Sequence, residues 1–180
     1  AAFAGALERL EDPWDRFFTG LRYATAVLKR SRDVSRFSEV ARYASELAEA
    51  LQSPVDVEFA EMLLNNLEAL HCVMRRDWDA AIALSEVTKT RAEGCRPGLP
   101  ESVVERYKST FRVNNAVAIS HVHGPQVAAS RLEEAIARCH PNDVGSIAEV
   151  KALHALFLVR AGHATRALDS LGDAICISAE

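Results

Sequence analysis

Prolines recur along this chain at intervals that a pair of helices would occupy. Pro13, Pro54, Pro100 and Pro141 are separated by 41, 46 and 41 residues, and a long helical pattern follows each of them. Proline favours the first position of a helix, because its missing N–H would have no partner there. The spacing predicts four two-helix units over residues 13–53, 54–99, 100–140 and 141–180. A short capping helix is predicted before them, over residues 1–12.

A second marker keeps the same interval. In each unit a shorter helix is predicted whose apolar residues recur on one side, with the period of about 3.6 residues that an α-helix has. A pair of residues from this stripe, at 40/41, 81/82, 127/128 and 167/168, lies 26 to 28 positions after the proline of its unit. The four stripes are Phe37, Val40, Ala41, Ala44, Leu47, Ala48 and Leu51; Trp78, Ala81, Ile82 and Ser85; Val127, Ala128, Leu132, Ala135, Ile136 and Cys139; and Ala164, Ala167, Leu168, Leu171, Ala174 and Ile175.

The first helix of each unit has a different pattern. Residues 59–74, 113–119 and 150–159 are apolar on most sides, so these helices need cover on several faces. An inner layer of such helices behind an outer layer of one-sided helices is the arrangement of an α-solenoid. No stretch has the alternation and turns of a β-hairpin. The sequence therefore predicts an all-α fold, an array of about four antiparallel helix hairpins.

Two turns carry a family resemblance. The segment Arg76-Asp-Trp-Asp-Ala-Ala-Ile82 resembles the turn of a tetratricopeptide repeat, in which a small Ala seats the second helix against the first. Residues 161–168 match the spacing of that family's Gly, Ala and large apolar positions, whereas its signature residues in the first helix do not occur. The period, longer than the usual one of about 34 residues, resembles that of the sensor solenoids of large ATP-dependent LuxR-type regulators, such as the maltose regulator.

The resemblance implies a function as well as a fold. It implies a right-handed tetratricopeptide-like solenoid that binds a protein, peptide or small-molecule effector in its concave groove. We expect this module to be the sensor or interaction segment of a larger bacterial transcription or signalling regulator. The alternative is a stand-alone peptide receptor or scaffold protein with no effector domain.

Two asparagine pairs, at 65–66 and 114–115, lie inside predicted first helices. Asn is a poor helix former and is costly to bury without a partner. In one interpretation they bond to neighbouring helices or point to water. In the other, implied by the family, Asn66 and Asn114 lie at equivalent heights on one concave binding surface. Placing the family's groove positions on this chain adds Arg22, Lys29, His121, Glu149 and Arg160, with apolar Val113, Val117 and Leu156 on the same surface.

No other chemistry is predicted. The segment His71-Cys-Val-Met-Arg75 lacks the spacing and glycines of a phosphatase loop, and His121 and His123 point about 200° apart on a helix, so we expect neither catalysis nor a metal site. No nucleotide-binding or other cofactor motif occurs. The net charge of −4 argues against a nucleic-acid partner. No apolar run approaches the roughly 18 residues of a membrane helix, and the first residues do not resemble a signal peptide, so we expect a cytoplasmic protein.

The cysteines and the C-terminal end complete the predictions. Four scattered cysteines do not form a metal or redox motif, and we expect three of them to be small buried residues and Cys95 to be a loop thiol. Ile175 and Ile177 cannot share one helix face, because they are about 200° apart. We therefore expect the C-terminal end to contact another chain, by self-association for example, or to be covered by further helices.

Overall fold

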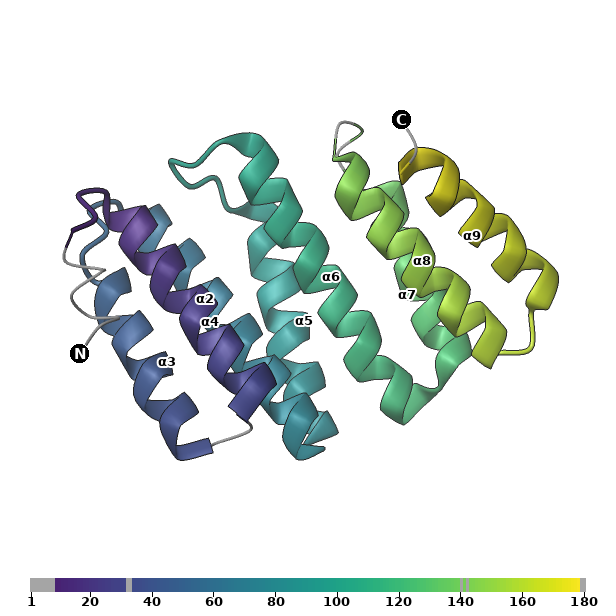
Figure 1. The fold of residues 1–180 in the computed structure, drawn as a ribbon, viewed down its shortest axis with the longest axis horizontal. Helices are drawn as coiled ribbons and strands as arrows, with labels where there is room; N and C mark the ends of the chain where they lie inside the picture. Colours follow the sequence, from purple (N-terminus) through teal and green to yellow (C-terminus); the bar gives the residue numbers. More distant parts are fainter. Residues whose placement is uncertain (1–8, 32–33, 140, 142, 179–180) are drawn as a thin grey trace.

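The computed structural model describes residues 9–31, 34–139, 141 and 143–178. The fold is all-α: within these residues there are eight helices and no strand (Figure 1). The helices are α2 (Pro13–Ser31), α3 (Val34–Ala48), α4 (Pro54–Arg75), α5 (Trp78–Gly94), α6 (Glu101–His123), α7 (Pro125–Ala137), α8 (Val144–Arg160) and α9 (Ala164–Ser178). The expected capping helix lies mainly outside the described residues, and residues 9–12 form a turn and a bend, not a helix.

The predicted prolines mark helix starts with different accuracy. Pro13 and Pro54 are the first residues of α2 and α4, and Pro100 is the N-cap of α6. The prediction is wrong for Pro141, because α8 starts three residues later. The carboxylate of Asp143 accepts a hydrogen bond from the backbone N–H of Ser146 at 3.2 Å and so caps α8 in its place.

Contacts between helices follow a regular order along the chain. Consecutive helices pack in pairs, α2 with α3, α4 with α5, α6 with α7, and α8 with α9. The second helix of each pair also packs against the first helix of the next pair. The first helices α2, α4, α6 and α8 contact one another in order, whereas no two second helices touch within the described residues. In Figure 1 the pairs succeed one another across the molecule, from α2 and α3 at one end to α8 and α9 at the other.

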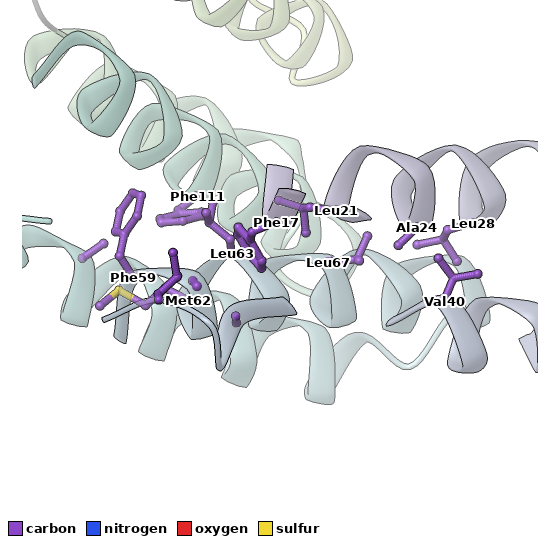
Figure 2. Close-up of a cluster of buried hydrophobic side chains, with 14 of the residues drawn as sticks. Phe17, Leu21, Ala24, Leu28, Val40, Phe59, Met62, Leu63, Leu67 and Phe111 are labelled. Carbon is purple, nitrogen blue, oxygen red and sulfur yellow. The ribbon is translucent and has the colours of Figure 1, made fainter. Parts of the chain in front are cut away.

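The larger core cluster joins α2, α3, α4 and α6 and is rich in phenylalanine. Phe17, Phe37, Phe59 and Phe111 are fully buried in it. Figure 2 shows Phe111 of α6 close to Phe59 of α4, and the two ring centroids are 6.4 Å apart. Large aromatic side chains bury the most apolar area per residue, so this half of the molecule carries the heaviest core.

A second cluster joins α6, α7, α8 and α9 and consists largely of alanine, including Ala116, Ala128 and Ala167. A small third cluster, Cys72, Ala81 and Ala118, lies between α4, α5 and α6. Small side chains let helix axes approach closely, which is the role that the sequence predicts for Ala81. The corresponding residues of the other second helices, Val40, Ala128 and Ala167, are buried as well, so the predicted register of these helices is confirmed at this position.

The predicted stripes fail at Val127 of α7, although Leu132 of the same stripe is fully buried, and at the large apolar residues of α9. Val127 of α7 is exposed, and on α9 Leu168 and Ile175 are 69% and 62% exposed. The buried face of α9 is formed by small residues, Ala167, Ser170 and Ala174, because these pack directly against α8. Leu171 is exposed on the same side of α9 as Leu168.

Helix α8, the first helix of the last pair, is also less covered by other helices than predicted. Leu156 and Val159 of α8 are exposed. The reason is that α4 and α6 each pack against first helices on both sides, whereas α8 packs against α6 alone among the described first helices.

The cysteine predictions are correct in part. Cys72 is buried as expected, but Cys139 is half-buried and Cys176 is exposed, because it lies on the outward face of α9. Cys95 lies in the loop after α5, yet it is buried, and burial raises the pKa of its thiol. None of the helices in the described chain combines the length and apolar character needed to cross a bilayer.

Candidate binding groove

A groove of about 350 Å³ runs across the first helices α2, α4, α6 and α8. We call it the groove throughout. Its floor is apolar, with Leu63 and Leu67 of α4 and Val113 of α6, and its polar side chains come from all four helices. Five of the seven residues predicted for a partner-binding groove line it: Arg22, Lys29, Asn66, Asn114 and Glu149.

The cationic wall of the groove is α2. Arg22 and Lys29 are seven residues apart, so they lie on one face of the helix about two turns from each other. Both side chains are exposed, and no ion pair joins either of them to a described residue. The wall therefore presents two uncompensated positive charges to the groove.

The two asparagines meet between α4 and α6. The Nδ2 of Asn114 donates a hydrogen bond to the Oδ1 of Asn66 at 2.9 Å. Both side chains are half-buried and line the groove, so they lie on one shared surface. The bond leaves both N–H groups of the Asn66 amide and the Oδ1 of Asn114 available. These are the complementary groups that a peptide bond needs, one to accept and one to donate.

Asn115, the neighbour of Asn114 on α6, bonds to another helix and does not line the groove. The Nδ2 of Asn115 donates to the Oγ of Ser85 at 3.1 Å and to the Oε2 of Glu86 at 3.0 Å. Asn115 is almost fully buried, and these bonds tie α6 to α5. For this residue the interpretation as a bond to a neighbouring helix is therefore correct.

The opposite wall of the groove is α8. Glu149 is exposed there and, like the two cations, has no ion pair with a described residue. Thr25 and Thr110 also line the groove, and their hydroxyls donate to backbone carbonyls of their own helices at 2.8 and 3.1 Å. Their oxygens consequently face a ligand as acceptors. The groove is thus positive along α2 and negative at α8.

An aromatic hollow continues the groove towards the start of α2. It has a volume of about 510 Å³ and shares Arg22 and Tyr107 with the groove. Here the rings of Trp14, Phe18 and Tyr107 form a stack, with centroids 5.2 and 5.5 Å apart. Burial raises the pKa of Tyr107, although Arg22 opposes the shift, so the phenol stays protonated.

The sequence prediction missed this aromatic end. Aromatic residues one turn apart on α2 are as typical of a buried core face as of a ligand site. Only the approach of α6 shows that these rings line a hollow. Asp12 and Asp15 also line the hollow, which gives its outer end a negative charge.

The remaining two predicted groove residues lie elsewhere. The ring of His121 stacks on Trp78, with centroids 4.0 Å apart and planes at 10°. It lies two turns beyond Asn114 on α6, about 10 Å away along the axis. The guanidinium of Arg160 lies 5.6 Å from the ring centroid of Phe157, at the exposed end of α8. Neither residue lines the groove.

A serine, a histidine and a glutamate come together on α7, α8 and α9, but not as a nucleophile. The Nδ1 of His154 lies 3.0 Å from the Oγ of Ser170, and its Nε2 lies 3.4 Å from Glu133. The hydroxyl of Ser170 donates to the carbonyl of Lys151 at 3.0 Å and is buried. A serine whose proton is held by a backbone carbonyl is not activated by the imidazole, so this network serves packing.

No three His, Cys, Asp or Glu side chains among the described residues gather closely enough to hold a metal ion.

No family model matches the chain, and searches of curated proteins and of solved structures find no match. The resemblance to tetratricopeptide and LuxR-type solenoids therefore stays a prediction.

Proposed function

We propose that this chain is a helical repeat module that binds an extended peptide in the groove. The observation that carries the proposal is the convergence of three charged side chains without an ion pair, Arg22, Lys29 and Glu149, and of the hydrogen-bonded amides of Asn66 and Asn114 on one groove with an apolar floor. Ligand sites combine an apolar lining with a few convergent polar groups in this way. Neither wall compensates its own charges, so a ligand of complementary charge is favoured.

The proposed architecture is a right-handed α-solenoid of four antiparallel hairpins, similar to a tetratricopeptide array. The order of helix contacts supports it, because first helices touch one another and second helices do not. In a solenoid of this kind the first helices line the concave side, and the groove between the first helices is consistent with that arrangement. Handedness is the part of this proposal that rests on the resemblance alone.

The dimensions of the groove select the ligand. From Trp14 to Lys29, α2 extends over about 22 Å, which matches about six or seven residues of extended chain. The charges of the groove set the orientation of the bound peptide. Acidic groups of the peptide lie along α2, and a basic group lies near Glu149. The amides of Asn66 and Asn114 bind the backbone between them, and the aromatic hollow takes an apolar side chain. Binding through the backbone makes such a site tolerant of sequence in its middle.

A displayed library of random heptapeptides tests the proposal. We expect selection against the whole chain to enrich peptides that carry at least one acidic residue. The double variant R22A/K29A should bind an enriched peptide about twofold to thirtyfold more weakly, because each exposed ion pair contributes about 0.2–1 kcal/mol. The change is measured by fluorescence anisotropy of the labelled peptide.

Arg30 provides the matched control, because it is an exposed cation of the same helix that does not line the groove. R30A should bind the peptide as the unmodified chain does. Enrichment of basic peptides, or equal losses in R30A and R22A/K29A, would show that the groove does not select the ligand.

A wider role follows from the resemblance to LuxR-type regulators, which supports the proposal that the module is the sensor or interaction segment of a larger bacterial regulator. The stand-alone receptor or scaffold is the alternative. The full coding sequence decides between them: an ATPase with Walker motifs or a helix-turn-helix in the same gene supports the regulator, whereas an open reading frame with neither supports the receptor.

Self-association through α9 is a separate proposal with its own observation. Leu168, Leu171 and Ile175 are exposed and recur at steps of three and four, so they form one apolar stripe on the helix surface. Multi-angle light scattering over a range of concentrations tests it. At high concentration we expect the L168E variant to have a lower apparent mass than the unmodified chain. An unmodified chain that is monomeric at every concentration would contradict the proposal.

A further inference from the structure

A second cavity, separate from the groove, lies between α5, α6 and α7. It has a volume of about 160 Å³ and is lined mainly by cationic side chains: Lys89 of α5, Arg112 of α6, Arg131 in the middle of α7, and Arg138 at the C-cap of α7. Asn115 and Glu134 complete the polar lining. It shares no lining residue with the groove.

The carboxylates around this cavity do not balance its cations. Lys89 pairs with Glu86 at 2.8 Å, and Arg131 pairs loosely with Glu134 at 3.4 Å. Glu93 serves two arginines: its Oε1 lies 2.8 Å from Arg112 but 3.4 Å from Arg138. Four cations thus share three carboxylates, and one positive charge is left over. Burial opposes the ionisation of Glu93, yet the neighbouring arginines lower its pKa, so it is a carboxylate at neutral pH.

Arg112 is the residue whose hydrogen bonding is incomplete. Its side chain is only 7% exposed, and both its Nε and its Nη2 donate to the same oxygen of Glu93, at 3.1 and 2.8 Å. The Nη1 is buried and has no acceptor. A buried guanidinium nitrogen without a partner is costly, and a ligand that brings an acceptor oxygen to it removes that cost. The two loosely paired arginines flank the same cavity.

We propose that this cavity is a binding site for a tetrahedral oxyanion, a phosphate group. A phosphate supplies several acceptor oxygens for the free N–H groups, and its charge of about −1.5 to −2 at pH 7 is opposite in sign to the surplus charge of the cavity. Arginine is the preferred partner of phosphate because its planar donors meet two oxygens at once. Arg131 and Arg138 exchange their long bonds to carboxylates for bonds to the ligand, while Arg112 keeps Glu93 and adds a bond from its Nη1.

Isothermal titration of the whole chain at fixed ionic strength tests the site. The probes are inorganic phosphate and O-phosphoserine, so that free phosphate and a phosphate monoester are distinguished. We expect a dissociation constant of about 1 mM or tighter for at least one of them. The double variant R131Q/R138Q should bind about tenfold more weakly or worse, because bonds to charged groups are lost.

Two further variants complete the test. Arg91 is the matched control, because it has the same 40% side-chain exposure as Arg131 and also forms an ion pair, with Glu58; R91Q should bind like the unmodified chain. E134Q removes a negative charge from the cavity and should tighten binding several-fold. Partial unfolding of the variant could only weaken binding, so it cannot explain such a gain. The proposal is overturned if neither probe binds, if R131Q/R138Q and R91Q bind equally well, or if E134Q weakens binding.

Discussion

Ala81 is the residue at which one added side chain tests the packing of three helices at once. It has no exposed surface and belongs to the small cluster with Cys72 of α4 and Ala118 of α6. The substitution Ala81→Leu adds three carbon atoms to a fully buried site between α4, α5 and α6. Either α5 moves away from its neighbours or the new side chain adopts a strained rotamer, and both outcomes destabilise the fold.

The magnitude follows from the nature of the contact. Overpacking a well-packed core costs about 1–3 kcal/mol. In a chain of 180 residues, each kcal/mol lowers the melting temperature by about 2–4 °C. We therefore expect the melting temperature of Ala81→Leu to be about 2–12 °C below that of the unmodified chain. The urea midpoint should fall as well, with an unchanged slope, because the surface exposed on unfolding stays nearly the same.

Circular dichroism melts at 222 nm measure the effect, and Ala83 provides the control. Ala83 lies on the same helix but is exposed, so Ala83→Leu makes the same chemical change at a site without neighbours. Alanine and leucine are both good helix formers. The variant Ala83→Leu should therefore melt within about 1 °C of the unmodified chain. Equal melting temperatures for the two variants would mean that Ala81 is not an interhelical contact and that the register of α5 is wrong.

Three other predictions concern single polar contacts. Glu93→Gln should lower the free energy of unfolding by about 2 kcal/mol in urea titrations, because buried Arg112 loses its charged acceptor; no change would contradict the pairing. Burial lowers the pKa of His154, against the opposing effect of Glu133. The folded state therefore disfavours protonation, and stability should fall as pH drops below the ordinary value of 6.5. His154→Gln should flatten this dependence in melts between pH 7.5 and 5. Asp77→Ala should cost about 1 kcal/mol, because the side chain caps α5, and an unchanged urea midpoint would contradict that role.

The fold was predictable because its signals are local. Pro13 and Pro54 mark helix starts, and the register of Ala81 is given by its own turn, since Asp77 caps the helix four residues earlier. Pro141 gave the wrong start because a proline also occurs in the loop before a cap, and the nearby Asp143 supplies the stronger signal. The orientation of α9 was not predictable, because its apolar residues recur on two faces and only the packing of α8 decides which face is buried.

The groove was predictable to the extent that polar residues inside neighbouring first helices face one another. Asn66 and Asn114 are such residues, and they meet. His121 did not follow this rule, because Trp78 offers its ring a closer partner at the end of α6. The phosphate-sized cavity left no trace in the sequence. Arg131 and Arg138 belong to α7 and its C-cap, but Lys89 and Arg112 come from α5 and α6, so only the packing of the three helices brings the four cations together.

The division of the core at α6 has a consequence for cooperativity. Phe111 of α6 belongs to the phenylalanine-rich cluster, whereas Ala116, about one turn later, belongs to the alanine-rich one. Between them α6 turns polar side chains, Arg112 and Asn115, towards α5, and the buried residues of the two clusters stay separate. Repeat arrays whose neighbours are weakly coupled unfold in steps. We expect native-state hydrogen exchange to resolve two foldons, with amides of α8 and α9 exchanging at a lower free energy than those of α2 and α4.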